Sequence, residues 1–314
     1  MLKEEKMSNR NIKVFDMDAR RPQVLLLGNG LTYSTGVPWP ELIQKVAKDR
    51  TVCEKYEKKD GAGKTVSFHV PNTVLTLATS ETDDIQRHQK YGEALQCSAY
   101  ASNAWLSKLL CFPFDAVLTA NYTYELEAEL YSGYPGLTTE SKRKYAYVTS
   151  DTRDAKYLLH TYNRFGQQDV WHIHGELRRP SSIILSHDEY ARLVHHILAY
   201  NENRGRDYEK YRNELKFKSW VDYFLVGDVY TLGLGLDFSE FDLWWLLGRR
   251  LRERAGCGKF IFYEPEKTDN HYKLLALQDA GVEVRSCGVI IRDGGDYARF
   301  YALAIEDIQA QVRK

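Results

Sequence analysis

The amino-acid sequence predicts an α/β fold, with a parallel sheet, helices on both of its faces and a mostly helical insertion. Short apolar runs alternate with helical patterns through the last third of the chain, as in units that place parallel strands side by side. Nearer the start, the apolar run QVLLL at residues 23–27 ends directly in glycine, which is typical of a buried parallel strand.

Local patterns predict the elements of the first half of the chain. Two prolines, Pro38 and Pro40, favour a helix start around residue 39. A polar, turn-rich stretch follows, and Asp60-Gly61 is the candidate turn of a hairpin within it. The other expected elements are a strand at 23–27, a helix at 39–50, a helical stretch at about 83–110, a strand at 116–119 and a helix at 125–130.

The second half alternates more clearly. Tyr190, Leu193 and Ile197 follow helical spacing on one face. Residues 201–219 are polar and charged, and we expect an exposed helix there. The remaining expectations are strands at 170–175, 183–185, 229–236, 259–263 and 282–285, and helices at 190–198, 241–254, 271–280 and from about 297. The predicted architecture is Rossmann-like.

Composition places the chain among ordinary globular proteins, with 314 residues, 43% of them hydrophobic and 27% charged. The net charge of zero argues against direct binding of nucleic acid or anionic membrane. No apolar run reaches the roughly 18–20 residues that span a bilayer, and the charged N-terminus lacks the apolar core of a signal peptide. We therefore expect a cytoplasmic protein.

We expect a single domain over residues 1–314, with helical or irregular insertions at about 51–110, 131–168 and 190–220. The five cysteines form no CxxC pair. That pattern favours free thiols in a reducing compartment, and no bound metal is expected.

The first candidate site is the segment GNGLTYSTGVP, from Gly28 to Pro38, between a strand and a helix. Glycines in this position let backbone N–H groups approach a diphosphate, and the helix dipole favours the anion. Taken alone, the GxG pattern is more often an ordinary tight turn.

Two further candidates lie where predicted strands end. Thr119 ends one strand and Asn121 follows it. An asparagine there can orient a hydroxyl or a water, although taken alone it more often caps the next helix. His172 and His174 lie in the segment VWHIHG. A histidine titrates near neutrality and can act as a general base. The alternatives are a structural histidine or a metal ligand, and the sequence offers no clear third ligand.

The fourth candidate is the segment from Gly233 to Asp242, where a strand again ends in glycines and a helix begins. Small residues such as Gly233 and Gly235 would let a cofactor lie across the sheet edge, and the Asp242 carboxylate could accept ribose hydroxyls. Helix capping by Asp237 or Ser239 explains part of the same pattern.

Taken in order, these four segments resemble the sirtuin family. The matches are Gly28, Gly30, Thr32, Gly36 and Pro38 to the GAGxSxxxGIP loop, Thr119 and Asn121 to the TQN segment, His174 and Gly175 to the HG pair, and Gly233 to the GTS region. The resemblance implies an NAD-binding domain. It extends over residues 24–242, and the order of the motifs is more specific than any one of them.

Three segments, Gly36 to Leu42 (GVPWPEL), Thr119 to Glu127 and Ser239 to Asp242, loosely match motifs of one group within this family. On these segments the sequence resembles the bacterial sirtuin-like NAD hydrolases of anti-phage defence. That resemblance implies catalytic roles for Asn121 and His174. The residues that we expect to contact NAD are Gly28, Asn29, Gly30, Thr32, Gly36, Pro38, Thr119, Gly233, Gly235 and Asp242, of which Asn29 replaces the alanine of the family loop. Thr123 stands where the family usually has aspartate. The zinc-binding cysteines of protein-deacylating sirtuins are missing, which disfavours deacylation.

The resulting expectation is an NAD hydrolase that releases nicotinamide and ADP-ribose, with NAD as its substrate. An unrestrained NAD hydrolase would poison its own cell, so we expect a gated effector. The segments that interrupt the strand–helix alternation, above all the basic and aromatic stretch 142–164, favour a homo-oligomer, although this stretch can equally be a solvated loop. The resemblance further implies a role in anti-phage defence and a partner such as a ring ATPase or a phage sensor. The alternatives are a non-catalytic subunit that binds NAD or ADP-ribose, and an NAD-dependent deacylase or ADP-ribosyltransferase. His172 receives no chemical role, and we expect His172→Ala to keep full activity.

Overall fold

A computed structural model describes most of the chain, in the ranges 13–15, 20–31, 37, 39–48, 50–80, 83–96, 103–132, 156–165, 168–210, 215–253, 257–266, 270–292 and 294–312. Its centre is a seven-stranded sheet in which six strands are parallel and one edge strand is antiparallel. In spatial order the strands are β11 (Glu283–Arg285), β10 (Phe260–Tyr263), β9 (Asp228–Leu232), β2 (Gln23–Leu27), β5 (Ala116–Thr119), β7 (Gln168–His172) and β6 (Asn163–Phe165). The predicted Rossmann-like α/β architecture is confirmed.

The strand order reverses at β2. From β2 the chain adds β5 and β7 on one side, and then crosses to add β9, β10 and β11 on the other. A reversal of this kind leaves a crevice at the carboxyl ends of the two central strands, which is where open α/β sheets bind ligands. The topology therefore points to the ends of β2 and β9.

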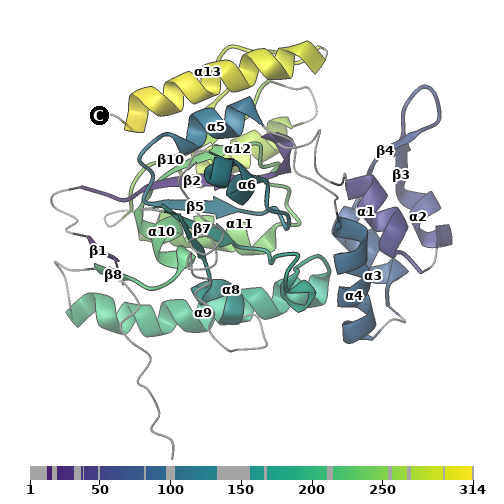
Figure 1. The fold of residues 1–314 in the computed structure, drawn as a ribbon, viewed down its shortest axis with the longest axis horizontal. Coiled ribbons are helices and arrows are strands. Elements are labelled where there is room, and N and C mark those ends of the chain that lie inside the picture. Colours follow the sequence, from purple (N-terminus) through teal and green to yellow (C-terminus); the bar gives the residue numbers. More distant parts are fainter. Residues whose placement is uncertain are drawn as a thin grey trace, which may run out of the picture.

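Helices cover both faces of the sheet (Figure 1). Along β2, Val24 and Leu26 belong to one hydrophobic core, whereas Leu25 and Leu27 belong to the other, as the two-residue period of a strand requires. The first core includes side chains from α8 (Lys156–His160), α9 (His187–Lys210), α10 (Trp220–Val226), α11 (Phe241–Arg252) and α12 (His271–Asp279). The second includes α5 (Ala104–Leu110), α6 (Glu125–Ser132) and α13 (Gly294–Val312).

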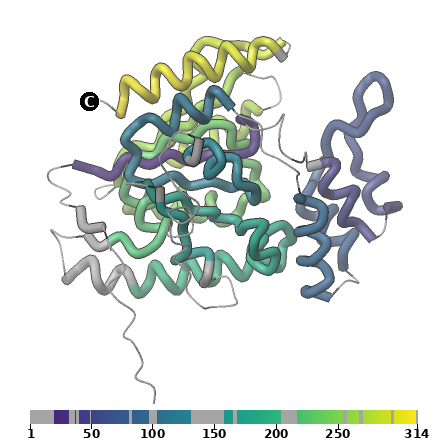
Figure 2. The backbone as a smooth tube through the Cα atoms, in the orientation of Figure 1, coloured from purple at the N-terminus to yellow at the C-terminus, as the bar shows by residue number. Residues whose placement is uncertain are grey.

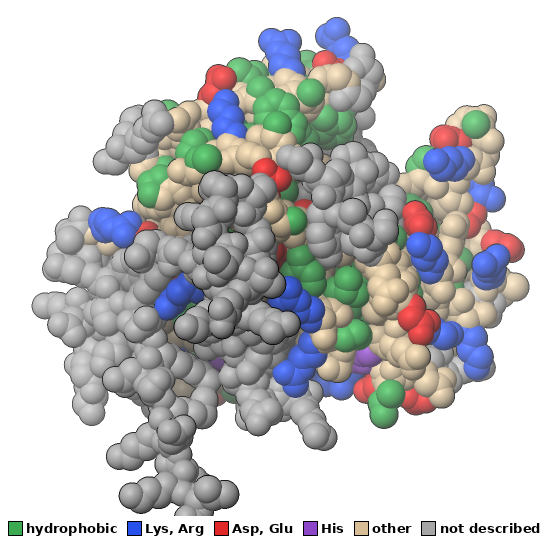
Figure 3. All heavy atoms as spheres, in the orientation of Figure 1, with side chains coloured by type: hydrophobic (Ala, Val, Ile, Leu, Met, Phe, Trp, Pro, Cys, Tyr) green, Lys and Arg blue, Asp and Glu red, His purple; other side chains and the backbone are tan. Residues whose placement is uncertain are grey.

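A small, mostly helical lobe stands beside the carboxyl edge of the sheet (Figures 1 and 2). It comprises α1 (Trp39–Val46), α2 (Arg50–Tyr56), β3 (Glu57–Lys59), β4 (Thr65–Phe68), α3 (Pro71–Ala78) and α4 (Asp84–Leu95). The strands β3 and β4 pair as an antiparallel hairpin, as expected around Asp60. On the face in Figure 3, basic and acidic side chains are mixed over the lobe.

The lobe has its own hydrophobic core, which includes two residues from outside it. Ile183 and Leu185 are fully buried among the side chains of α1, α3 and α4. The part of the loop between β7 and α9 that follows His174 is therefore packed against the lobe.

Some sequence predictions are wrong in detail. Residues 183–185 form no strand, because Ile183 and Leu185 pack into the lobe core instead of a β-ladder. The helix expected over 201–219 ends at Lys210 with α9, and Leu215–Phe217 is β8, which pairs antiparallel with β1 (Lys13–Phe15). The strand expected at 229–236 ends at Leu232, because Gly233 turns the chain with φ +68°.

No helix in the described part of the chain is both long and apolar enough to cross a membrane.

The close approach of β2 and β9 yields a stability prediction. A Cβ atom added at Gly28 would lie 2.5 Å from the Cα of Leu234, which is backbone and cannot swing away. We expect Gly28→Ala to lower the free energy of unfolding by about 1–3 kcal/mol, measured by chemical denaturation. Gly61→Ala is the matched control, because a Cβ there meets nothing within 4 Å. Equal stability of Gly28→Ala and the wild type would contradict this account.

Candidate functional site

The carboxyl ends of four neighbouring strands lie at one level. The registers pair Leu27 of β2 with Leu232 of β9 on one side and with Thr119 of β5 on the other, and Thr119 pairs with His172 of β7. Two of the four candidate segments begin directly after this row, at Gly28 and Gly233, and the other two begin in it, at Thr119 and His172. The fold therefore brings together, along one edge, motifs that are more than 200 residues apart in the sequence.

The two glycine segments are in contact at the reversal of the strand order. The Gly28 N–H donates to the Leu232 carbonyl at 3.2 Å, and the Gly30 N–H donates to the Gly233 carbonyl at 2.7 Å. Asn29 lies between them in a short 3₁₀ helix, Asn29–Leu31. At Gly235 an added Cβ would meet nothing within 4 Å, so this backbone borders open space. The predicted contacts at Thr32, Gly36 and Pro38 lie outside the described residues.

Asn121 is buried two residues beyond β5. Its N–H donates to the Oγ1 of Thr119 at 3.1 Å, and its carbonyl accepts a hydrogen bond from Nδ1 of His172 at 2.7 Å. Thr119 is itself fully buried at the strand end. The backbone around Asn121 is thus held from both β5 and β7.

His174 lies in the turn after β7 and forms a buried pair with Asp242. Its Nε2 lies 2.9 Å from Oδ2 of Asp242, in the first turn of α11, and these side chains are 2% and 0% exposed. Burial by itself lowers the pKa of His174, but the charge of Asp242 and its hydrogen bond raise the pKa above the ordinary value. The ring of Tyr190 meets the His174 ring edge-on, with centroids 5.4 Å apart.

The second oxygen of the Asp242 carboxylate, Oδ1, is buried and has no hydrogen-bond partner among the residues that the structure describes. A buried carboxylate oxygen normally accepts a hydrogen bond, so this atom fits a ligand hydroxyl or a water. Close to the pair, burial raises the pKa of Glu240 to about 7, although the nearby His174 lowers it.

Hydrogen bonds to main-chain carbonyls tie the Asn121 segment to the His174 segment. The Tyr122 hydroxyl donates to the Ile184 carbonyl at 3.0 Å, and the Ile184 N–H donates to the His174 carbonyl at 2.8 Å. The Leu177 N–H donates to the Tyr122 carbonyl at 2.8 Å. Asn121 and His174, which the sequence predicts as a catalytic pair, therefore belong to neighbouring, connected loops.

His172 forms a second buried pair that sequence reasoning missed. Its Nε2 lies 2.8 Å from Oε1 of Glu127 in α6, on the opposite face of the sheet from Asp242. Burial lowers the pKa of His172, but the carboxylate of Glu127 outweighs this effect and raises the pKa to about 9. In the sequence, Glu127 ends the loosely matched segment Thr119 to Glu127, but nothing local indicates that His172, 45 residues away, is its partner.

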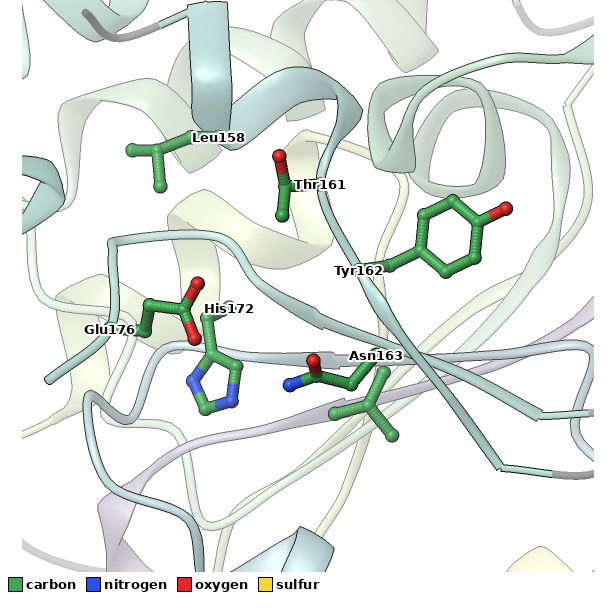
Figure 4. Close-up of a pocket in the computed structure, with 7 residues that line it drawn as sticks. Leu158, Thr161, Tyr162, Asn163, His172 and Glu176 are labelled. Atoms are coloured by element: carbon green, nitrogen blue, oxygen red, sulfur yellow. The ribbon is translucent and has the colours of Figure 1, made fainter. Parts of the chain in front are cut away.

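A small pocket borders this second pair (Figure 4). Its lining residues are Leu158, Thr161, Tyr162, Asn163, Val170, His172 and Glu176. The side chains of Glu176 and Asn163 lie on either side of the His172 ring (Figure 4). Among the described residues, no group of three or more histidine, cysteine, aspartate and glutamate side chains could hold a metal ion.

A family model described as a SIR2-like domain matches residues 115–284, which is more than half of the chain. The chain belongs to the SIR2-like domain family. Membership indicates an NAD-related activity in general. The matched part of this SIR2-like domain runs from β5 to β11 and includes Asn121, His174, Gly233 and Asp242, whereas the Gly28 loop precedes it. A search of the curated proteins found no match.

The His172–Glu127 pair predicts how stability depends on pH. The folded pKa of His172, about 9, exceeds its ordinary 6.5, so its contribution is complete below pH 6.5 and is lost as the pH rises through 9. The pKa of Glu127 is lowered by His172 despite burial, so its contribution is present above pH 4.5 and is lost in acid.

We expect the free energy of unfolding between pH 6 and 10 to fall by about 2–3 kcal/mol more in the wild type than in His172→Asn/Glu127→Gln. The double variant keeps polar side chains but cannot form the ion pair. Urea denaturation at each pH measures the difference, and parallel pH profiles would refute the pairing.

Proposed function

We propose that this SIR2-like domain hydrolyses NAD at the bond between nicotinamide and ribose, and so releases nicotinamide and ADP-ribose. One observation supports the proposal above others: the register of β9, β2, β5 and β7 brings the two glycine segments, Asn121 and His174 to one edge at the reversal of the strand order. Dinucleotides bind at this position in doubly wound sheets.

In the proposed complex, the diphosphate lies against the backbone of the Gly28 segment. Gly233 and Gly235 let the nucleotide approach the end of β9, where Gly235 borders open space. The unpartnered Oδ1 of Asp242 is an acceptor for a ribose hydroxyl, which is the role that the sequence suggests for this residue. The nicotinamide riboside then points toward Asn121 and His174.

The chemistry needs a leaving group and a base. When the C1′–N bond breaks, its electron pair neutralises the cationic nicotinamide ring, and the ribose passes through an oxocarbenium-like state. Asn121 holds the ribose or the incoming water. Water adds to C1′, and its proton goes to the imidazole of His174. The Asp242 carboxylate, 2.9 Å from Nε2, stabilises the imidazolium that forms and orients the ring.

A mutational series tests the proposed base. Asn121→Ala and His174→Ala should each abolish nicotinamide release from NAD, with circular dichroism showing an intact fold. Asp242→Asn should lower the maximal rate roughly 100-fold, since it removes the stabilising charge. His195→Ala, on the exposed side of α9, is the control and should stay within twofold of the wild type.

The pH dependence of nicotinamide release provides a second test of His174 as the base. His174 accepts a proton only when neutral, and its raised pKa puts the acidic limb of activity above pH 6.5 in the wild type. In Asp242→Asn, both effects of Asp242 are lost, and burial outweighs the remaining, smaller effect of Glu240, so the limb should move to lower pH. Full activity of Asn121→Ala or His174→Ala would refute the assignment. If turnover required an acylated or acceptor substrate, the function would be deacylation or ADP-ribosyl transfer. If NAD bound without turnover, the chain would be a regulatory subunit.

We also propose that the activity is gated, as expected of an effector of anti-phage defence. An unrestrained NAD hydrolase would deplete the NAD of its own cell. The resemblance of the sequence to defence NAD hydrolases suggests a partner such as a ring ATPase or phage sensor. The homo-oligomer is suggested by the basic and aromatic composition of residues 142–164, of which 142–155 lie outside the described residues. We expect specific activity to rise with protein concentration, in step with the mass found by light scattering. A monomer with full, concentration-independent activity would exclude this form of control.

A further inference from the structure

Both ring nitrogens of His172 have a hydrogen-bond partner. Nδ1 faces the Asn121 carbonyl at 2.7 Å, and Nε2 faces the Glu127 carboxylate at 2.8 Å. A carbonyl oxygen only accepts hydrogen bonds, so Nδ1 must carry a proton and donate it. An ionised carboxylate likewise only accepts. The ring therefore donates in two directions, to a helix on one side and to the Asn121 backbone on the other.

The His172 ring is fixed by its neighbours. Glu127, which is 3% exposed, also accepts a hydrogen bond from the Asn163 amide at 2.9 Å. The Tyr124 ring meets the His172 ring edge-on, with centroids 5.3 Å apart, and its hydroxyl donates to Glu176 at 2.8 Å. The ring is thus held by Glu127 of α6, which Asn163 of β6 supports, and by Tyr124, which Glu176 supports. These contacts determine where Nδ1 points.

We infer that His172, anchored by Glu127, is a positioning residue that fixes Asn121 for NAD cleavage by donating a hydrogen bond to its main-chain carbonyl. This inference rests on the proposed function. It also reverses the expectation from the sequence alone that His172→Ala keeps full activity.

The physical reason is the precision that such a site requires. Asn121 lies two residues beyond β5, and the last hydrogen bond to the neighbouring strand on that side is made by the Ala120 N–H, which donates to the Leu27 carbonyl at 3.0 Å. A displacement of about 1 Å at a reacting group costs on the order of 100-fold in rate. Beyond Ala120, the hydrogen bond from His172, whose ring is also held by Glu127 of α6, fixes the Asn121 main chain and so sets the position of the Asn121 side chain.

A matched pair of variants isolates this hydrogen bond. His172→Ala alone would leave the Glu127 carboxylate buried without its cation and could unfold the protein. We therefore compare His172→Ala/Glu127→Gln with His172→Asn/Glu127→Gln. Both pairs are uncharged, but only asparagine places an N–H where Nδ1 stands. His195→Ala is the surface control.

We expect the asparagine pair to keep kcat for nicotinamide release within about tenfold of the wild type, and the alanine pair to lose a further 100-fold with little change in KM. Equal kcat values of the two pairs, or an equal loss spread over kcat and KM, would overturn the inference.

Hydrogen–deuterium exchange separates this inference from the proposed function. Peptides covering residues 119–124 should exchange faster in the alanine pair than in the asparagine pair, and Asn121 need not be active for this difference to appear. If the wild type releases no nicotinamide, the proposed function fails, and the exchange data alone decide whether His172 positions the loop. Equal exchange in the two pairs would overturn the positioning role.

Discussion

The parallel pairing of β2 with β5 on one side and with β9 on the other is the constraint on which the rest of the site depends. It sets the ends of these strands level with one another, and β7 continues the row through its pairing with β5. Loops that leave a level row of parallel strands are forced into contact. Gly28 and Gly233 are therefore required by packing, whatever their part in ligand binding, since a side chain at Gly28 would strike the neighbouring backbone.

Beyond this row, two histidine–carboxylate pairs connect the sheet to helices on its opposite faces. His174 reaches Asp242 of α11, and His172 reaches Glu127 of α6. Burying such charges costs free energy, and a well-packed apolar pair would often be at least as stable. What the pairs provide is a defined orientation for two rings near Asn121. Both pairs lie at the carboxyl ends of strands, where the fold places ligands.

The strands and the glycine turns could be predicted from the sequence because their signals are local. An apolar run that ends in glycine indicates a buried strand and its exit, as at Leu27. The partners of the histidines could not be predicted, because Glu127 and Asp242 are 45 and 68 residues away from them. At residues 183–185 a local signal misled the prediction. The apolar pattern there suggested a strand, but Ile183 and Leu185 pack into the core of the lobe.

The motif HIHG thus places two histidines two residues apart in environments that suit different chemistry. Both nitrogens of His172 are engaged, and Glu127 keeps its pKa near 9, so at neutral pH this ring already holds both protons. It can donate hydrogen bonds but cannot accept a proton. For His174, the described residues supply a partner at Nε2 only, so in the proposed reaction the other ring nitrogen accepts the proton and Asp242 stabilises the charged ring. The two histidines thus suit the two roles proposed for them, His174 as the base and His172 as the residue that positions Asn121.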